Sequence, residues 1–119
     1  MKTKIRTQNS PTKSQVEQFE ILFPLLNSVY DEIKEMSKKQ PDGKLNEKKV
    51  NMINKILSNV KTLLAKDPLI EYLDILEDAS IPSYSDVALI LTQHKTALFQ
   101  FRERHVGWNG FETDWVTID

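Results

Sequence analysis

The sequence predicts an all-α protein, an antiparallel four-helix bundle with a kinked first helix and an aromatic, partly extended C-terminal arm. Apolar residues recur at intervals of three and four in four separate segments, which is the period of amphipathic helices. Only 3 of the 119 residues are glycine, and all three lie at or beyond position 43, so long stretches contain no helix breaker. Clusters of Pro, Asp, Gly and Ser separate the periodic segments and mark turns.

Length and composition indicate a single domain. We expect residues 12–119 to fold together behind a flexible basic tail, residues 1–11. Hydrophobic residues make up 39% of the chain and charged residues 28%, as in ordinary globular proteins. The absence of cysteine excludes a disulfide framework and suits a reducing compartment. Because the chain has neither a secretory signal nor a long apolar run, we expect a cytoplasmic protein with no membrane segment.

The first helix is predicted from Ser14 to about Lys39. Ser14 and Glu17 have the spacing of a capping box, in which each side chain satisfies a backbone N–H of the other residue. Pro24 interrupts the apolar pattern, and its ring collides with the carbonyl of Glu20. We therefore expect a kink or break near Phe23.

The second helix is predicted from about residue 45 to residue 65, after a turn at residues 40–43. Its apolar residues are spaced by three and four, and lysines occupy the opposite side. The stripe consists of Lys44, Lys48, Lys55 and Lys66. Such a stripe is usually the solvated face of a helix.

A shorter third helix is predicted over residues 68–79, with Asp67 as its N-cap and Pro68 in its first position. Its inward face would be Leu69, Tyr72, Leu73 and Leu76. A fourth helix is predicted from Ser83 to His105, and its apolar face includes His94. We expect His94 to be a buried, hydrogen-bonded residue that binds no metal.

The arm, residues 106–119, has a different character. It holds both tryptophans and an Asn109-Gly110 turn signal. Trp115, Val116 and the residues after them favour extended structure, so one short strand or a small hairpin is expected here.

Two carboxylate pairs are the strongest enzymatic feature. Glu32 and Glu35 end the first helix, and Glu71 and Asp74 lie three residues apart in the third. Two helices that bring such pairs together can hold Mg²⁺. With Asp31 in the first position, the pattern resembles the E-E-x-x-E and E-x-x-D motifs of the all-α nucleotide pyrophosphohydrolases of the MazG and dUTPase type. The resemblance implies a Mg²⁺-dependent nucleotide hydrolase with these four carboxylates as metal ligands.

The charge distribution suggests a third possibility. Residues 1–66 carry a net charge of +6 and residues 67–119 carry −7. The basic tail and the lysine stripe could bind nucleic acid weakly. The stripe lacks the arginine and aromatic side chains that nucleic-acid recognition prefers, so we expect no nucleic-acid partner.

The interpretation we favour is a non-enzymatic helical interaction or regulatory protein, with no catalytic residue, cofactor or metal ion. Leu89 and Phe99 lie outside the apolar face of the fourth helix, and the arm adds more aromatic surface than a small monomer can cover. The expected interface is Leu89, Phe99, Trp108, Phe111 and Trp115. It would bind a protein partner or form a homodimer.

Overall fold

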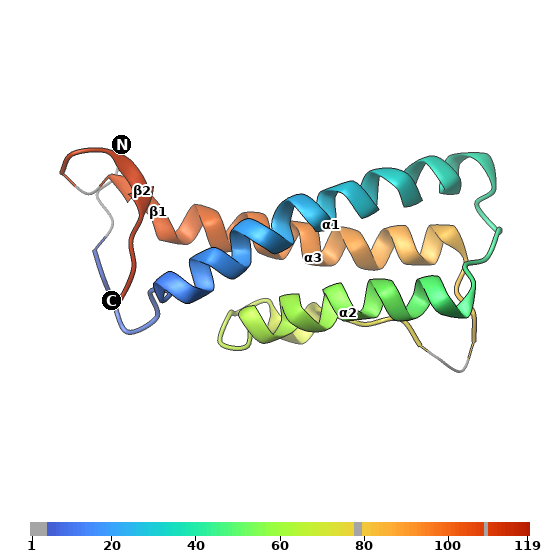
Figure 1. Ribbon diagram of the computed structural model, residues 1–119, viewed down its shortest axis with the longest axis horizontal. Coiled ribbons are helices and arrows are strands. Elements are labelled where there is room, and N and C mark those ends of the chain that lie inside the picture. The colour runs from blue at the N-terminus through green and yellow to red at the C-terminus, as the bar shows by residue number, and fades with distance from the viewer. Residues whose placement is uncertain (1–4, 78–79, 109) are drawn as a thin grey trace.

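A computed structural model describes residues 5–77, 80–108 and 110–119. Within these residues the chain forms three α-helices, one turn of 3-10 helix and a two-stranded antiparallel sheet. In order these are α1 (Lys13–Lys39), α2 (Glu47–Leu63), η1 (Ile70–Tyr72), α3 (Tyr84–His105), β1 (Val106–Trp108) and β2 (Thr113–Trp115). The predicted four-helix bundle is therefore wrong, although the described residues are mostly helical and add only a small two-stranded sheet. The molecule is elongated, with extents of 50 × 24 × 20 Å, and α1 lies along α3 for most of that length (Figure 1).

The capping box of α1 lies two residues before the predicted one. The backbone N–H of Gln15 donates to Oγ1 of Thr12 at 3.1 Å, and the backbone N–H of Thr12 donates to Oε1 of Gln15 at 2.9 Å. Thr12 and Gln15 thus take the roles that the sequence suggested for Ser14 and Glu17.

Pro24 lies inside the continuous helix α1, so a break near Phe23 is wrong, while a kink there stays a prediction. Pro24 and Glu20 are both exposed, and water can reach the carbonyl that the proline leaves without a donor. Buried residues lie on both sides of Pro24, with Phe19 and Leu22 before it and Leu26 and Ile33 after it. Packing of this apolar stripe holds the helix continuous against the local cost of proline.

The helix α2 begins at an Asn46 cap, whose side-chain oxygen accepts a hydrogen bond from the Lys49 amide at 2.8 Å. Its buried residues follow the predicted spacing and are Val50, Ile53, Leu57, Val60 and Leu63. The four lysines of the stripe are all exposed, as expected for a solvated face.

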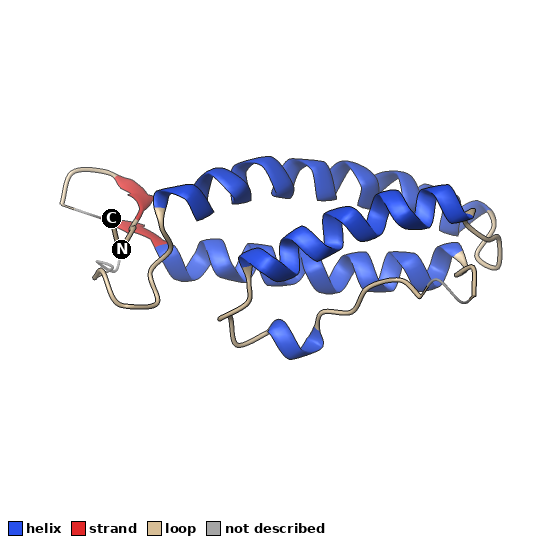
Figure 2. Ribbon diagram, turned by 60° about the horizontal axis from the view of Figure 1, so that its bottom comes forward, coloured by secondary structure: helices blue, strands red, loops and turns tan. Residues whose placement is uncertain are grey.

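The third helix predicted over residues 68–79 is wrong for residues 68–77, and residues 78–79 lie outside the part of the chain that the structure describes. Asp67 does cap a turn, accepting from the Leu69 amide at 2.9 Å, but only the single turn η1 forms, and the chain is extended from Leu73. Because α2 and α3 run in the same direction, the connection must travel back along α2 (Figures 1 and 2). A helix of 12 residues spans about 18 Å, short of the roughly 26 Å length of a 17-residue helix. An extended chain covers more than twice that distance per residue.

The core lies between the three helices and beneath this extended segment. The helix α3 contributes the largest share, and its buried residues are Tyr84, Val87, Leu91, His94, Ala97, Leu98 and Phe101. The prediction that His94 is buried is confirmed, with none of its surface exposed. Leu73 and Leu76 of the extended segment complete the core on the open side.

The start of α3 is joined to the turn between α1 and α2. The Tyr84 amide donates to the Gly43 carbonyl at 2.7 Å, and Lys44 pairs with Ser83 as an isolated antiparallel bridge. A Cβ on Gly43 would lie 2.8 Å from the Tyr84 ring, so this close approach requires glycine.

The C-terminal arm is a small hairpin, with Val106 opposite Trp115 and Trp108 opposite Thr113. The chain then returns to the start of α1, where the Ile118 amide donates to the Pro11 carbonyl at 2.8 Å. Ser10 and Pro11 are buried, so chain packing begins before residue 12. No helix among the described residues is long and apolar enough to cross a membrane.

Candidate interaction surface

An uncharged strip runs along the solvent side of α3. It consists of Leu89, Thr92, Thr96 and Phe99, spaced three and four residues apart, and all four are exposed. Leu89 is 66% exposed and Phe99 is 51% exposed. Both residues lie off the core face, as the sequence predicted, so α3 is apolar on two sides.

A groove of about 240 Å³ lies between η1 and this strip. Its lining comes from both walls and consists of Leu69, Tyr72, Leu73, Leu89, Thr92, Gln93 and Thr96. Tyr72 was predicted to face inward, but it is 62% exposed because η1 ends after one turn and leaves the ring on the outer rim.

The extended segment that continues from the wall opposite α3 is fixed by side chains rather than by its own secondary structure. Gln93 accepts from the Asp74 amide at 3.1 Å and donates to the Asp74 carboxylate at 3.0 Å. On the other side, Asn54 of α2 donates to the Leu76 carbonyl at 2.8 Å and accepts from the Leu76 amide at 2.7 Å. Amide side chains thus take the place of a neighbouring strand.

His94 adds a third contact to the same extended segment. Its Nε2 lies 2.7 Å from the Asp74 carbonyl oxygen, which can only accept, so Nε2 carries the proton. Nδ1 is buried and has no hydrogen-bond partner among the described residues. Burial lowers the pKa of His94 below its ordinary value, and nearby Lys61 adds to the effect, while the bond to the Asp74 carbonyl and the Asp74 charge act in the opposite direction. His94 is therefore a neutral structural residue at pH 7.

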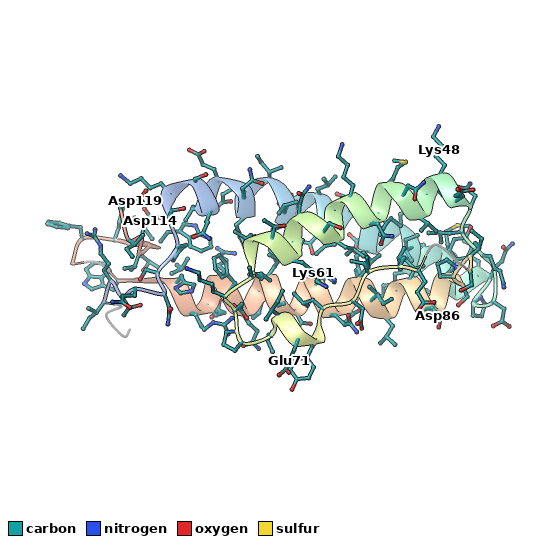
Figure 3. The ribbon with its side chains drawn as sticks, turned by 90° about the horizontal axis from the view of Figure 1, so that it is seen from below. Lys48, Lys61, Glu71, Asp86, Asp114 and Asp119 are labelled. Carbon is teal, nitrogen blue, oxygen red and sulfur yellow. The ribbon has the colours of Figure 1, made fainter. Side chains whose placement is uncertain are left out.

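The groove lies in an acidic part of the chain. Residues 67–94 contain six acidic residues and no lysine or arginine. Asp67 is buried and forms an ion pair with Arg104. Glu71, Glu77 and Asp86 are exposed, and Glu71 projects away from the molecule (Figure 3).

The aromatic residues of the arm divide into two groups. Trp108 is 39% exposed and Phe111 is 90% exposed. Trp115 instead packs edge-on against Phe19, with ring centroids 4.9 Å apart, and its Nε1 donates to Glu20 at 3.1 Å. Trp115 is the one expected interface residue that is mainly structural.

The carboxylates of the hydrolase alternative are all exposed. Glu35 pairs with Lys38 at 3.4 Å, and Asp74 is held by Gln93. Among the residues that the structure describes, no group of three or more His, Cys, Asp or Glu side chains could hold a metal ion. Glu32, Glu35, Glu71 and Asp74 are therefore not brought together as a ligand set.

Two lysines of the stripe, Lys48 and Lys55, line a shallow depression along α2, while Lys44 and Lys66 lie outside this helix. The lining of the depression is Asn46, Glu47, Lys48, Asn51, Met52 and Lys55. This lining contains one acidic residue, no arginine and no aromatic side chain. Arginine is the residue that binds phosphates in a bidentate manner, and aromatic side chains stack on bases.

Reasoning from the sequence missed the residues that build the groove. Asn54 and Gln93 stand in helical segments next to buried positions, and an amide at such a boundary is a signal that it bonds a neighbouring backbone. Their partners could not be identified while residues 73–77 were expected to be helical, because a helix satisfies its own backbone groups.

Comparison of the chain with protein-family models, with curated proteins and with solved structures found no match.

Proposed function

We propose that this chain is a non-enzymatic interaction or regulatory protein of the cytoplasm. It binds a protein partner, or a second copy of itself, through the exposed strip of α3 and the hairpin residues Trp108 and Phe111. The observation that carries the proposal is the exposure of Leu89 and Phe99 on one side of α3, the helix that also contributes the largest share of the core. Apolar surface of this kind, extended by aromatic residues, is characteristic of interfaces.

Two features favour binding over catalysis. Among the described residues, the buried acid Asp67 and the buried His94 are engaged in structural contacts with Arg104 and the Asp74 carbonyl. The four carboxylates of the pyrophosphohydrolase alternative are exposed and separate, so the hydrolase proposal has no ligand cluster to support it.

The proposal is tested by placing a photo-crosslinking amino acid at Phe99 in the cells from which the sequence comes. Crosslinked products should form at this position and be absent when the same residue replaces Ile21 of α1, which is 61% exposed and lies off the strip. Sedimentation velocity of the purified protein identifies which products are homodimers. Phe99→Glu should abolish the association and leave helicity unchanged. A monomer that yields the same crosslinks at Phe99 as at Ile21 would contradict the proposal.

A further inference from the structure

We infer that the groove between η1 and α3 receives the apolar face of a basic amphipathic helix from a partner protein. The inference rests on the proposed function, and it specifies which part of the surface binds and what chemistry the partner has.

The dimensions of the strip fit a helix. The α3 side of the groove runs from Leu89 to Thr96, seven residues apart, which corresponds to about 10 Å along α3 and to almost two turns of a partner helix. The strip continues beyond the groove to Phe99. Leu69, Tyr72 and Leu73 raise one wall beside the strip, so the surface is a channel rather than a plane. Amphipathic helices bind such channels through apolar residues spaced at i, i+3 or i+4, and i+7.

The channel is formed before any partner arrives. The opposite wall is built on η1, where the Tyr72 amide donates to the Leu69 carbonyl at 3.0 Å. The backbone that follows this wall is bonded at Asp74 by Gln93 and His94, and at Leu76 by Asn54. A wall that is already ordered saves the entropy that a loop would lose on binding. This favours a rigid occupant that fits the channel over a segment that remodels it.

Charge selects the partner. The exposed carboxylates of Glu71, Glu77 and Asp86 stand in a stretch of 28 residues, 67–94, without a lysine or arginine. Lysines or arginines beside the apolar stripe of a partner would meet these acids, which raises the association rate and disfavours acidic partners.

A second copy of the chain is the competing occupant. Its α2 presents Met52, 61% exposed, between the exposed Lys48 and Lys55. However, Lys48 and Glu71 project from opposite sides of the molecule (Figure 3). Two copies joined through these faces would each keep one face unpaired and would extend into an open chain rather than close as a dimer.

The test uses a fluorescent Lys/Leu peptide of about 18 residues, patterned as an amphipathic helix, with binding followed by anisotropy. Two control peptides are needed, one with Glu in place of Lys and one with the same composition in scrambled order. The patterned basic peptide should bind the intact protein, with an affinity that falls as salt rises, and both controls should bind at least about tenfold more weakly.

Matched protein variants locate the site. Leu89→Gln should weaken peptide binding about tenfold or more, while Ile21→Gln, at a similarly exposed position (61% against 66%), should leave it unchanged. Replacing Glu71 and Glu77 by Gln should weaken binding more than replacing Glu17 and Glu32, although both pairs change the net charge equally. Circular dichroism should show that all four variants remain folded, because every substituted residue is exposed.

Several results would overturn the inference. These are failure of the basic peptide to bind, equal binding of the acidic or scrambled peptide, or equal effects of Leu89→Gln and Ile21→Gln. Open-ended self-assembly that Leu89→Gln abolishes would assign the groove to a second copy instead. Crosslinks specific to Phe99 without peptide binding would leave the proposed function standing and remove only this inference.

Discussion

At the scale of single residues, buried His94 gives the stability of the fold a dependence on pH. It is fully buried, its Nε2 proton is committed to the Asp74 carbonyl, and a proton added at Nδ1 would be an unpaired buried donor. These features keep the ring neutral in the folded chain.

The first prediction follows from this state. Because the folded pKa of His94 is below the unfolded value of about 6.5, the unfolded chain binds more protons in the window beneath that value. The free energy of unfolding that depends on a neutral His94 is therefore fully present above about pH 6.5 and is lost progressively as the pH falls below that value. Urea unfolding at a series of pH values should show a steeper loss for the natural protein than for His94→Gln. Identical pH profiles would refute a neutral buried His94.

At the scale of elements, α1 carries a proline that the fold tolerates without needing it. Pro24 is exposed, so its replacement leaves the core untouched and restores a hydrogen bond to the Glu20 carbonyl. We expect Pro24→Ala to raise the free energy of unfolding by about 2 kcal/mol, part of the gain being offset by a more flexible unfolded chain. Ser28→Ala, at another exposed position on α1, is the control and should raise the free energy of unfolding by only a few tenths of a kcal/mol. Thermal denaturation measures both, and equal shifts would mean that the proline imposes no cost.

The extended segment after η1 depends on one amide side chain of α2. Asn54→Leu removes both hydrogen bonds to Leu76 and should lower the free energy of unfolding by about 1–3 kcal/mol. The Leu76 amide should then exchange with solvent faster, as hydrogen exchange followed by NMR can measure. Asn59→Leu, at an exposed position on the same helix, is the control. Unchanged protection at Leu76 would show that the segment is held by burial of Leu73 and Leu76 alone.

The elements also show what the sequence can and cannot predict. The helices α2 and α3 follow from unbroken apolar spacing, and their caps, Asn46 and Ser83, precede the first turn. The segment around Leu73 and Leu76 has the same spacing, but an extended chain also buries both leucines. Whether this segment is helical or extended depends on the parallel course of α2 and α3 and on partners distant in sequence, such as Gln93. Helical spacing alone predicts that Leu89 and Phe99 lie off the core face. The groove beside them could not be predicted, because it also depends on where η1 lies.

At the scale of the whole molecule, the hairpin closes one end of the core. Trp115 contacts Phe19 of α1 and Phe101 of α3, with ring centroids at 4.9 and 5.8 Å. We expect Trp115→Ala to lower the free energy of unfolding by about 2–4 kcal/mol, since it leaves a cavity between two helices. Trp108→Ala, on the paired strand but 39% exposed, should cost less than about 1 kcal/mol.

Chemical denaturation of the two tryptophan variants checks this division of roles. Near-UV circular dichroism provides a second measurement, because Trp115 lies in an asymmetric aromatic cluster and Trp108 does not share those ring contacts. Equal destabilisation by the two substitutions would mean that the hairpin contributes as a unit and not through Trp115.

The bond between Pro11 and Ile118 also bears on how this fold can be rewired. It sets the two ends of the described helical unit side by side, at the hairpin end of a molecule 50 Å long. A short linker between them would give a circular permutant whose three helices keep their places. A reporter domain fused before Pro11 or after Ile118 would be attached at the hairpin end of the molecule. Leu89 lies 16 residues, or about 24 Å, before the end of α3, so such a fusion would leave the groove open to a partner.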